Sequence, residues 1–435
     1  MEKRDLAVAI VADDLSGGAD CGVSFSHAGL DVAVQLDRRA EPPEWAQAAV
    51  VSTDSRDQGP DEARAAVAEA LTALASRHPA MWYKKIDSTL RGHLALELTV
   101  AIRGVRPELT VVAPAFPAHG RTVTGGHGFL DGTPLERTEV WRTQGLNGTA
   151  DLRAMLRAGG LRVRGLDLAA IRSGRAGKRL SALVGSADVV ICDAETEDDL
   201  AAVAASGQAS GLNVLWAGSA GLARHLAGLR TLNASSGGRS GGPSATLSGE
   251  RAPVAVVVGS AAGAAAAQLR HLETELGVRV VRVRAAAVLS GAAADELATA
   301  DRAIGEALGA KQDVALGLVS PGSPGGLVLD AASSRALSRA LGQLIGRHNG
   351  EIGGFVLTGG DTALAVLAAC GVRTLRLAGE VVTGVPVSIA CEDGRPVVTK
   401  AGAFGDEQVL ARAVGVLRGR EVRPANERNS FRASI

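Results

Sequence analysis

Two adjacent carboxylates, Asp13 and Asp14, directly follow a short apolar run near the start of the chain. Neighbouring carboxylates repel each other, so placing them side by side does little for folding. Side chains alternate between the two faces of a strand, so we expect one to face a crevice while the other caps the following helix. In the alternative, both are caps or lie in solvent. The functional interpretation is a carboxylate that binds hydroxyl groups or accepts a proton.

A second cluster occupies residues 84–93, Lys-Lys-Ile-Asp-Ser-Thr-Leu-Arg-Gly-His. The guanidinium of Arg91 has the shape to grip a carboxylate through two hydrogen bonds, and Asp87 and Ser88 suit sugar hydroxyls. Lysine is scarce in this chain, where arginine supplies most of the 46 basic residues, and the two residue types are not interchangeable. A charged surface turn is the alternative.

A third segment, residues 113–122, follows another apolar run and is stiffened by two prolines. Its Arg121 is either a second contact for an anion or part of a structural salt bridge. The three segments together predict a positively lined crevice with several hydroxyl-binding groups. Such a crevice suits a small polyhydroxy acid.

The C-terminal half carries two small-residue turns that each open a helix, Gly-Ser-Ala-Ala-Gly at 259–263 and Gly-Gly-Asp-Thr at 359–362. Free backbone N–H groups at a helix N-terminus bind anions, and the helix dipole favours this. Lys400, followed by Gly402 and Gly405, adds a compact positive charge. Each fragment alone is more often a tight turn, but three in one region predict a triphosphate site.

The elements that must position these residues alternate between short apolar strands and Ala/Leu-rich helices, which predicts an α/β fold with a mainly parallel sheet. Ligands of such sheets lie beyond the carboxyl ends of the strands. Residues 231–251 are rich in Gly and Ser and indicate a linker between a domain at 1–230 and a domain at 252–420, with a polar tail at 421–435. One domain with a long surface loop is the alternative.

Composition excludes several classes of protein. The 435 residues include 46 Lys+Arg and 46 Asp+Glu, a balance that argues against nucleic-acid binding. The four cysteines form no CxxC pair, and the eight histidines show no metal-ligand spacing, so we predict no structural metal site. No signal peptide or membrane-spanning helix is expected, and we predict a cytoplasmic protein. The P-loop and G-x-G-x-x-G motifs are missing.

Taken in order, the motifs resemble those of the four-carbon acid sugar kinase family, which includes 3-oxo-tetronate, threonate and erythronate kinases. The matching segments span nearly the whole chain: 12–17, 84–92, 114–117, 120–122, 359–362, 379–380, 384–386 and 400–405. Two segments depart from the family pattern. Ser-Gly-Gly at 16–18 replaces Thr-Gly-Ala, and Lys-Ala-Gly-Ala-Phe-Gly at 400–405 replaces Lys-Ser-Gly-Asn-Phe-Gly. The second difference leaves the exact substrate open.

The resemblance implies an N-terminal domain that binds the sugar acid, a C-terminal domain that binds ATP with Mg²⁺, and an active site in the cleft between them. It implies phosphorylation of a terminal hydroxyl, and a homodimer is a family-level expectation. By matching position, the sugar-acid site would contain Asp13, Asp14, Asp87, Ser88, Arg91 and Gly92, to which we add Lys85 and Arg121. Nucleotide contacts would be Ser260, Gly360, Asp361, Lys400 and Gly402, to which we add Gly359, Thr362 and Gly405.

The expected mechanism closes the two domains over the crevice. Arg91 would hold the acid's carboxylate, and Lys400 with Mg²⁺ would steady the phosphates. Asp14 is the first candidate for the base, followed by Asp13 and Asp87. The alternatives are a non-catalytic regulator that binds nucleotide and sugar acid, a kinase of a different small sugar acid, and a sugar-acid dehydrogenase. The dehydrogenase would need a G-x-G-x-x-G turn where this chain has Asp-Asp-Leu-Ser-Gly-Gly.

Overall fold

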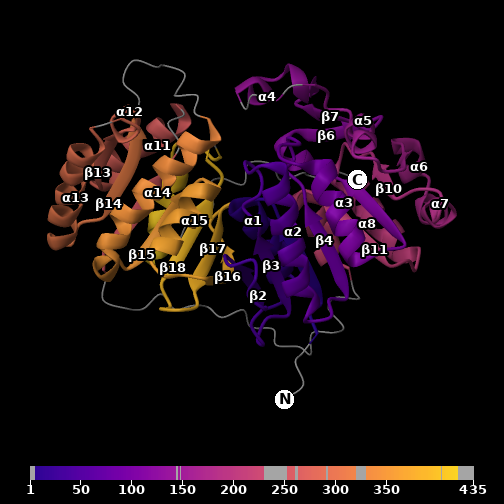
Figure 1. The fold of residues 1–435 in the computed structure, drawn as a ribbon, viewed down its shortest axis with the longest axis horizontal. Helices are drawn as coiled ribbons and strands as arrows, with labels where there is room; N and C mark the ends of the chain where they lie inside the picture. Colours follow the sequence, from indigo (N-terminus) through magenta and orange to yellow (C-terminus); the bar gives the residue numbers. More distant parts are fainter. Residues whose placement is uncertain are drawn as a thin grey trace, which may run out of the picture.

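A computed structural model describes residues 5–143, 146, 148–229, 252–259, 263–290, 292–319, 330–402 and 404–419. Within these residues the chain forms two α/β halves whose strands join in one fifteen-stranded sheet with helices on its faces (Figure 1). The strand order is β13-β14-β12-β15-β18-β17-β16-β2-β3-β1-β4-β11-β5-β10-β9. The predicted α/β class is confirmed. The expected linker and tail fall outside the described residues.

The N-terminal half contributes eight mutually parallel strands because each strand is followed by a crossover that returns the chain to the same end. These strands are β1 (Val8–Ala12), β2 (Val32–Gln35), β3 (Ala48–Ser52), β4 (Met81–Lys85), β5 (Leu109–Ala113), β9 (Val163–Leu166), β10 (Val189–Cys192) and β11 (Val214–Gly218). The helices are α1 (Leu15–His27), α2 (Pro60–Ala75), α3 (Leu94–Val105), α4 (Glu139–Thr143), α5 (Leu152–Ala158), α6 (Leu168–Arg172), α7 (Ala176–Leu183), α8 (Glu197–Ala209) and α9 (Ala220–Ala227).

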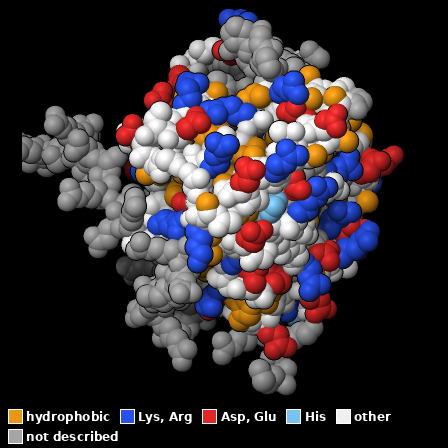
Figure 2. All heavy atoms as spheres, turned by 90° about the vertical axis from the view of Figure 1, so that its left-hand side faces the viewer, with side chains coloured by type: hydrophobic (Ala, Val, Ile, Leu, Met, Phe, Trp, Pro, Cys, Tyr) orange, Lys and Arg blue, Asp and Glu red, His pale blue; other side chains and the backbone are white. Residues whose placement is uncertain are grey.

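The C-terminal half contributes the other strands: β12 (Val254–Val258), β13 (Arg279–Arg284), β14 (Val314–Val319), β15 (Gly354–Thr358), β16 (Thr374–Glu380), β17 (Pro386–Ala390) and β18 (Pro396–Lys400). Its helices are α11 (Gly263–Leu276), α12 (Ala285–Val288), α13 (Ala293–Gly309), α14 (Ala331–Arg347), α15 (Gly360–Ala369) and α16 (Val409–Leu417). The strands β16 and β17 run antiparallel, which the sequence analysis did not predict. Lys and Arg side chains are intermixed with Asp and Glu on the described surface of this half (Figure 2).

The two halves meet where β16 pairs with β2 in antiparallel register, with Leu375 opposite Val34. Each strand would otherwise be an open edge with unpaired backbone groups, and their pairing satisfies those groups. A salt bridge between Arg376 and Asp31, at 2.6 Å, lies beside this pairing. The halves therefore share a sheet, whereas the sequence predicts a separate sheet for each domain.

Helix α1 lies across the join and packs on strands of both halves. Its glycines make this approach possible. A Cβ at Gly22 would lie 2.7 Å from Leu377 Cδ1 of β16, and a Cβ at Gly18 would lie 2.9 Å from Val50 Cγ1 of β3. Such distances are too short for real side chains. Gly18 and Gly22 therefore allow α1 to lie close to the sheet.

A small second sheet of β6 (Arg121–Thr124), β7 (His127–Leu130) and β8 (Thr133–Pro134) follows β5. A short 3-10 turn, η1 (Pro117–His119), precedes this sheet, and another, η2 (Leu135–Arg137), follows it. In the C-terminal half, a third 3-10 turn, η3 (Asn349–Glu351), precedes β15. The sequence analysis predicted no strand between residues 121 and 134. No helix in the described residues is long and apolar enough to cross a membrane.

Candidate active site

Asp13 and Asp14 stand at the carboxyl end of β1, and their side chains separate as strand alternation predicts. Asp14 is the N-cap of α1, where its Oδ2 accepts a hydrogen bond of 3.2 Å from the backbone N–H of Gly17. Asp13 is buried and faces the loop after β3. The first carboxylate is therefore a salt-bridged group inside the crevice, and the second is a cap at its rim.

Arg56 joins both carboxylates and was missed by the sequence analysis. Its Nε and Nη2 donate to Asp13 at 2.7 and 2.9 Å, and Nη2 also donates to Asp14 Oδ1 at 2.5 Å. Burial opposes the ionised form of Asp13, but Arg56 and two nearby lysines keep the pKa of Asp13 below its ordinary value. Arg56 lies just beyond the carboxyl end of β3, so the strand-end rule would have found it.

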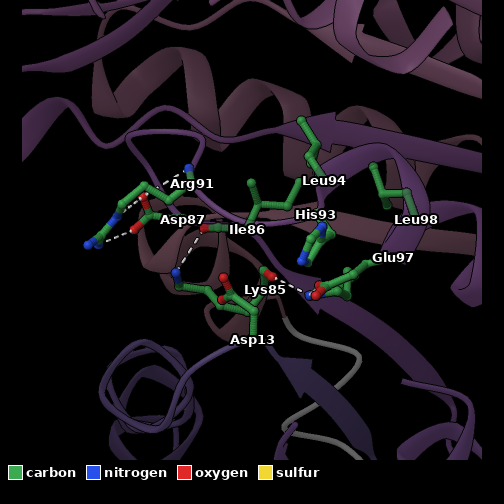
Figure 3. A pocket seen from close by; sticks show the side chains of 10 residues that line it. Asp13, Lys85, Ile86, Asp87, Arg91, His93, Leu94, Glu97 and Leu98 are labelled. Carbon is green, nitrogen blue, oxygen red and sulfur yellow. Dashed lines mark hydrogen bonds and ion pairs between the residues drawn. The ribbon is translucent and has the colours of Figure 1, made fainter. Parts of the chain in front are cut away.

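Asp87 and Arg91 form the second charged unit, built on the turn after β4. Arg91 Nε and Nη2 donate to the two oxygens of Asp87 at 2.7 and 2.8 Å. Burial opposes the charged form, but Arg91 and then Arg56 hold the pKa of Asp87 well below its ordinary value. Figure 3 shows this pair on one side of a pocket and His93 and Leu94 on the other.

Gly92 and Ser88 lie on the same turn. Gly92 has φ +83°, and a Cβ there would lie 3.2 Å from Asp13 Oδ2, so glycine allows the turn to pass close to that carboxylate. Ser88 is half-buried. The structure thus brings Asp13, Asp14, Asp87, Ser88, Arg91 and Gly92 together around one crevice at the ends of β1 and β4.

Lys84 and Lys85 are adjacent in the sequence but point to opposite faces of the sheet. Lys84 Nζ pairs with Glu97 of α3 at 2.8 Å, and both side chains are almost fully buried. Lys85 Nζ donates to the Ile86 carbonyl at 2.8 Å, and a Cβ at Gly17 of α1 would lie 3.1 Å from it. Only Lys85 therefore faces the helix that carries Asp14.

Arg121 begins β6, next to a tight hairpin that extends from the end of β5. The backbone of Phe116 and that of Arg121 exchange two hydrogen bonds, at 2.7 and 3.1 Å. The Ala115 carbonyl accepts a hydrogen bond of 2.6 Å from Ser219 Oγ at the end of β11. At the tip, the ring of His119 contacts Phe404 of the C-terminal half, with the ring centroids 5.2 Å apart.

The N-terminus of α15 is the part of the C-terminal half that reaches the crevice. A Cβ on Gly360 would lie 3.3 Å from Asp14 Oδ2 and 3.7 Å from the backbone N of Leu15. Gly359 has φ +95°, and its N–H donates to the Lys400 carbonyl at 2.9 Å. Thr362 is buried, and its hydroxyl lies 3.2 Å from Ser338 Oγ.

Three acidic side chains also border this contact. The pKa of Asp54 is raised to about 7, mainly by burial and to a smaller extent by the charges of Asp361 and Asp57. The pKa of Asp361 is also raised, mainly by burial and to a smaller extent by the charges of Asp57 and Asp14. The sequence analysis missed Asp54 and Asp57, although both also lie just after β3.

Lys400 lies at the end of β18 and is nearly fully buried. Its Nζ donates to the carbonyls of Ala401 and Gly402 at 3.0 and 2.9 Å, and burial lowers its pKa to about 8. In this arrangement Lys400 braces its own loop. Gly405, with φ +85°, makes the turn before α16. Ser260 lies outside the described residues, so its expected nucleotide contact stays a prediction.

Comparison with known proteins assigns a family model to each of the two halves. A family model described as a sugar-binding N-terminal domain matches residues 8–226, and one described as a nucleotide-binding C-terminal domain matches residues 255–410. A protein of Cupriavidus necator named D-threonate kinase is 40% identical over 92% of this chain and 95% of its own length. A D-threonate kinase of Salmonella typhimurium is 30% identical, over 93% and 97%.

A D-erythronate kinase of Heliobacterium modesticaldum is 29% identical over 94% of this chain and 97% of its own length. A solved Salmonella typhimurium structure has the same fold, with a TM-score of 0.75 at 21% identity, covering 93% of this chain and 98% of that one. The chain matches a sugar-binding and a nucleotide-binding model, and the three relatives named above are kinases, so the chain is a small-molecule kinase. The chain belongs to the four-carbon acid sugar kinase family.

Proposed function

We propose that this chain transfers the γ-phosphoryl group of ATP to the terminal hydroxyl of a four-carbon sugar acid, with D-threonate as the first candidate. The observation that carries the proposal is the close approach of the N-terminus of α15 to Asp14, where a Cβ on Gly360 would lie 3.3 Å from Oδ2. It sets a helix N-terminus, which favours phosphate, against a carboxylate at the rim of a crevice lined largely with charged side chains. D-threonate comes first because relatives with this name are up to 40% identical to the chain.

Asp14 is the best candidate for the base because its Oδ2 is the least engaged carboxylate oxygen of the crevice. Asp13 is gripped by both arms of Arg56, and Asp87 by both arms of Arg91. Asp14 accepts one short hydrogen bond on Oδ1, while Oδ2 holds only the 3.2 Å cap bond and faces Gly360. The substrate hydroxyl would give its proton to Asp14 as its oxygen bonds to the γ-phosphorus and ADP leaves.

The residues around this contact also fit Mg²⁺. No group of three or more potential ligands is preassembled among the described residues. Mg²⁺ in phosphoryl-transfer sites commonly uses one or two carboxylates plus substrate phosphates, so preassembly is not required. Asp54 and Asp361 would hold it, since each is a partly buried carboxylate whose pKa is raised by burial and by neighbouring acids. When bound, the ion would neutralise charge on the phosphates.

The test is ADP release from ATP and Mg²⁺ in the presence of D- and L-threonate, D- and L-erythronate and their 3-oxo forms, with longer sugar acids as controls. Turnover on a four-carbon acid supports the proposal and identifies the substrate. Failure with all of these acids, with ATP binding shown by calorimetry, contradicts it.

The base is tested with Asp14→Asn and the matched surface control Asp61→Asn. Asparagine caps helices as well as aspartate does, so folding of α1 is preserved while proton acceptance is lost. We expect kcat to fall by about 10²–10⁴-fold in D14N and to stay unchanged in D61N. A fall smaller than about tenfold in D14N would show that Asp14 is not the base.

A further inference from the structure

Arg335 is an arginine of the C-terminal half that reaches across to the N-terminal half. It lies near the start of α14, and its Nη1 donates a hydrogen bond of 2.6 Å to the backbone carbonyl of Asp57, in the loop after β3. Among the described residues this is its one hydrogen bond, and no carboxylate of that part of the chain forms an ion pair with it. The sequence analysis did not single it out.

The packing of α14 on α15 fixes where Arg335 lies along these helices. The two helices lie side by side (Figure 1). Ser338 Oγ lies 3.2 Å from Thr362 Oγ1, near the start of α15. Further along, a Cβ on Gly346 would lie 3.0 Å from Ala369 Cβ. The helices therefore run in the same direction, and Arg335, about one turn before Ser338, lies level with the turn that opens α15.

This turn is the part of the C-terminal half that faces Asp14. A Cβ on Gly360 would lie 3.3 Å from Asp14 Oδ2, and the first N–H groups of a helix have no partner within the helix. Arg335 starts beside that helix N-terminus, and its guanidinium ends at the Asp57 carbonyl on the opposite side of the gap. A cation that spans the gap borders the place where the phosphates and the substrate hydroxyl would meet.

The charges around Arg335 explain why it rests there in the free chain. Burial raises the pKa of Asp54 and of Asp361, and the positive charge of Arg335 opposes that rise in both. The guanidinium thus offsets part of the negative charge at this contact while it is held by a single hydrogen bond to a neutral carbonyl. Hydrogen bonds to an ionised acceptor are stronger than those to a neutral one, so a phosphate can replace the carbonyl as the acceptor.

We propose that Arg335 is a further catalytic residue that contacts the γ-phosphate of the bound nucleotide, an inference that rests on the proposed kinase function. In the reaction the hydroxyl oxygen of the sugar acid bonds to the γ-phosphorus, the bond from that phosphorus to the bridging oxygen of ADP breaks, and the hydroxyl proton passes to Asp14. Negative charge is then spread over the three outer phosphoryl oxygens. The guanidinium of Arg335 would leave the Asp57 carbonyl and donate to these oxygens through two parallel hydrogen bonds.

The experiment compares the wild type with Arg335→Gln, Arg335→Lys and the control Arg339→Gln, an exposed arginine about one turn further along α14. ADP release is measured with the acid that the wild type turns over. In R335Q we expect kcat to fall by about 10²–10³-fold, with KM for the acid changed less than about threefold. R335K keeps a point charge without the planar fork, so it should retain more activity than R335Q. R339Q should match the wild type.

Two further readouts separate a phosphate contact from a contact that only holds the halves together. Calorimetry compares Mg²⁺–ADP with the Mg²⁺ complex of the β,γ-imido analogue of ATP. R335Q should bind ADP as the wild type does and bind the analogue about ten- to hundredfold more weakly. Its unfolding temperature should fall by less than about 6 °C, because one hydrogen bond is lost. An unchanged kcat, equal effects on both nucleotides or a larger fall in unfolding temperature overturns the inference.

The inference and the proposed function fail in different ways. Wild-type turnover with an unaffected R335Q rejects the role of Arg335 and leaves the kinase function standing. If the wild type turns over none of the acids, the two nucleotides still decide the matter. A loss of affinity confined to the analogue supports the phosphate contact without the kinase reaction. Nucleotide binding that is equal in wild type and R335Q, weakened equally for both nucleotides or absent altogether overturns it.

Discussion

The adjacent lysines at the end of β4 should respond to the same substitution in opposite ways. Lys84 and Glu97 form a salt bridge of 2.8 Å in which the two side chains are 3% and 4% exposed. Glu97 also accepts a hydrogen bond of 2.6 Å from Ser55 Oγ. Lys85 lies on the other face of the sheet, near Gly17 of α1. Lys84 is therefore expected to serve folding and Lys85 to serve the reaction.

Replacing Lys84 by methionine keeps the aliphatic packing but leaves the Glu97 carboxylate buried with only one hydrogen bond. Breaking a buried ion pair from one side costs about 3–5 kcal/mol of unfolding free energy. In a domain of about 150–250 residues each kcal/mol corresponds to about 2–4 °C, so the unfolding temperature should fall by about 6–20 °C. Adding Glu97→Leu should recover most of this loss, because the unpaired charge is then removed.

Lys85→Met is the matched control, with the same change one residue later. It loses one hydrogen bond to a backbone carbonyl, so we expect a stability cost below about 2 kcal/mol. Because Lys85 faces the Asp14 helix, kcat/KM should fall by about 10²-fold. The measurements are calorimetric unfolding and ADP release for each variant. The reasoning is refuted if K84M unfolds within about 2 °C of the wild type, or if K85M loses as much stability as K84M.

Gly360→Ala should lower kcat by about tenfold in the ADP-release assay, since its Cβ would lie 3.3 Å from Asp14 Oδ2 and would displace that carboxylate by a few tenths of an ångström. Gly415→Ala, a helical glycine with open space around it, should leave kcat unchanged, and equal activity in both variants would contradict the contact. A second prediction concerns Asp54, whose pKa is raised to about 7. Between about pH 4 and pH 7 the folded chain therefore holds a proton that the unfolded chain has lost, and the free energy of unfolding falls as pH rises. Asp54→Asn should therefore be more stable than the wild type at about pH 8, by a margin that shrinks toward about pH 5. Urea unfolding across this pH range measures the difference in unfolding free energy. A difference that does not change with pH would reject the raised pKa of Asp54.

Local sequence patterns were sufficient for the continuous apolar strands of the fold. Runs such as Val8–Ala12 and Val254–Val258 are apolar on both faces and are fully buried in the structure. Strands covered on both faces read as continuous apolar runs, so sequence identifies them without knowledge of their neighbours. The rule that ligands lie beyond strand ends then drew attention to Asp13, Asp14 and Asp87, which do lie together.

Pairings between segments distant in sequence were beyond that reasoning. The strand-end rule would have marked Arg56 as a candidate, but its pairing with Asp13 and Asp14, more than forty positions away, is set only by the tertiary structure. The junction of β2 with β16 joins residues that are more than three hundred positions apart. No local signal encodes which edge strand meets which, because the choice depends on the shapes of two complete halves.

The chain by itself determined which residues can do chemistry, since side-chain type, strand alternation and helix caps are local properties. Only the tertiary structure decided which charges cancel. Arg91 pairs with Asp87 and Lys84 with Glu97, whereas Arg121 has no carboxylate partner among the described residues. The physical reason is that an ion pair forms or fails over a few ångströms, and only the packed fold sets distances on that scale.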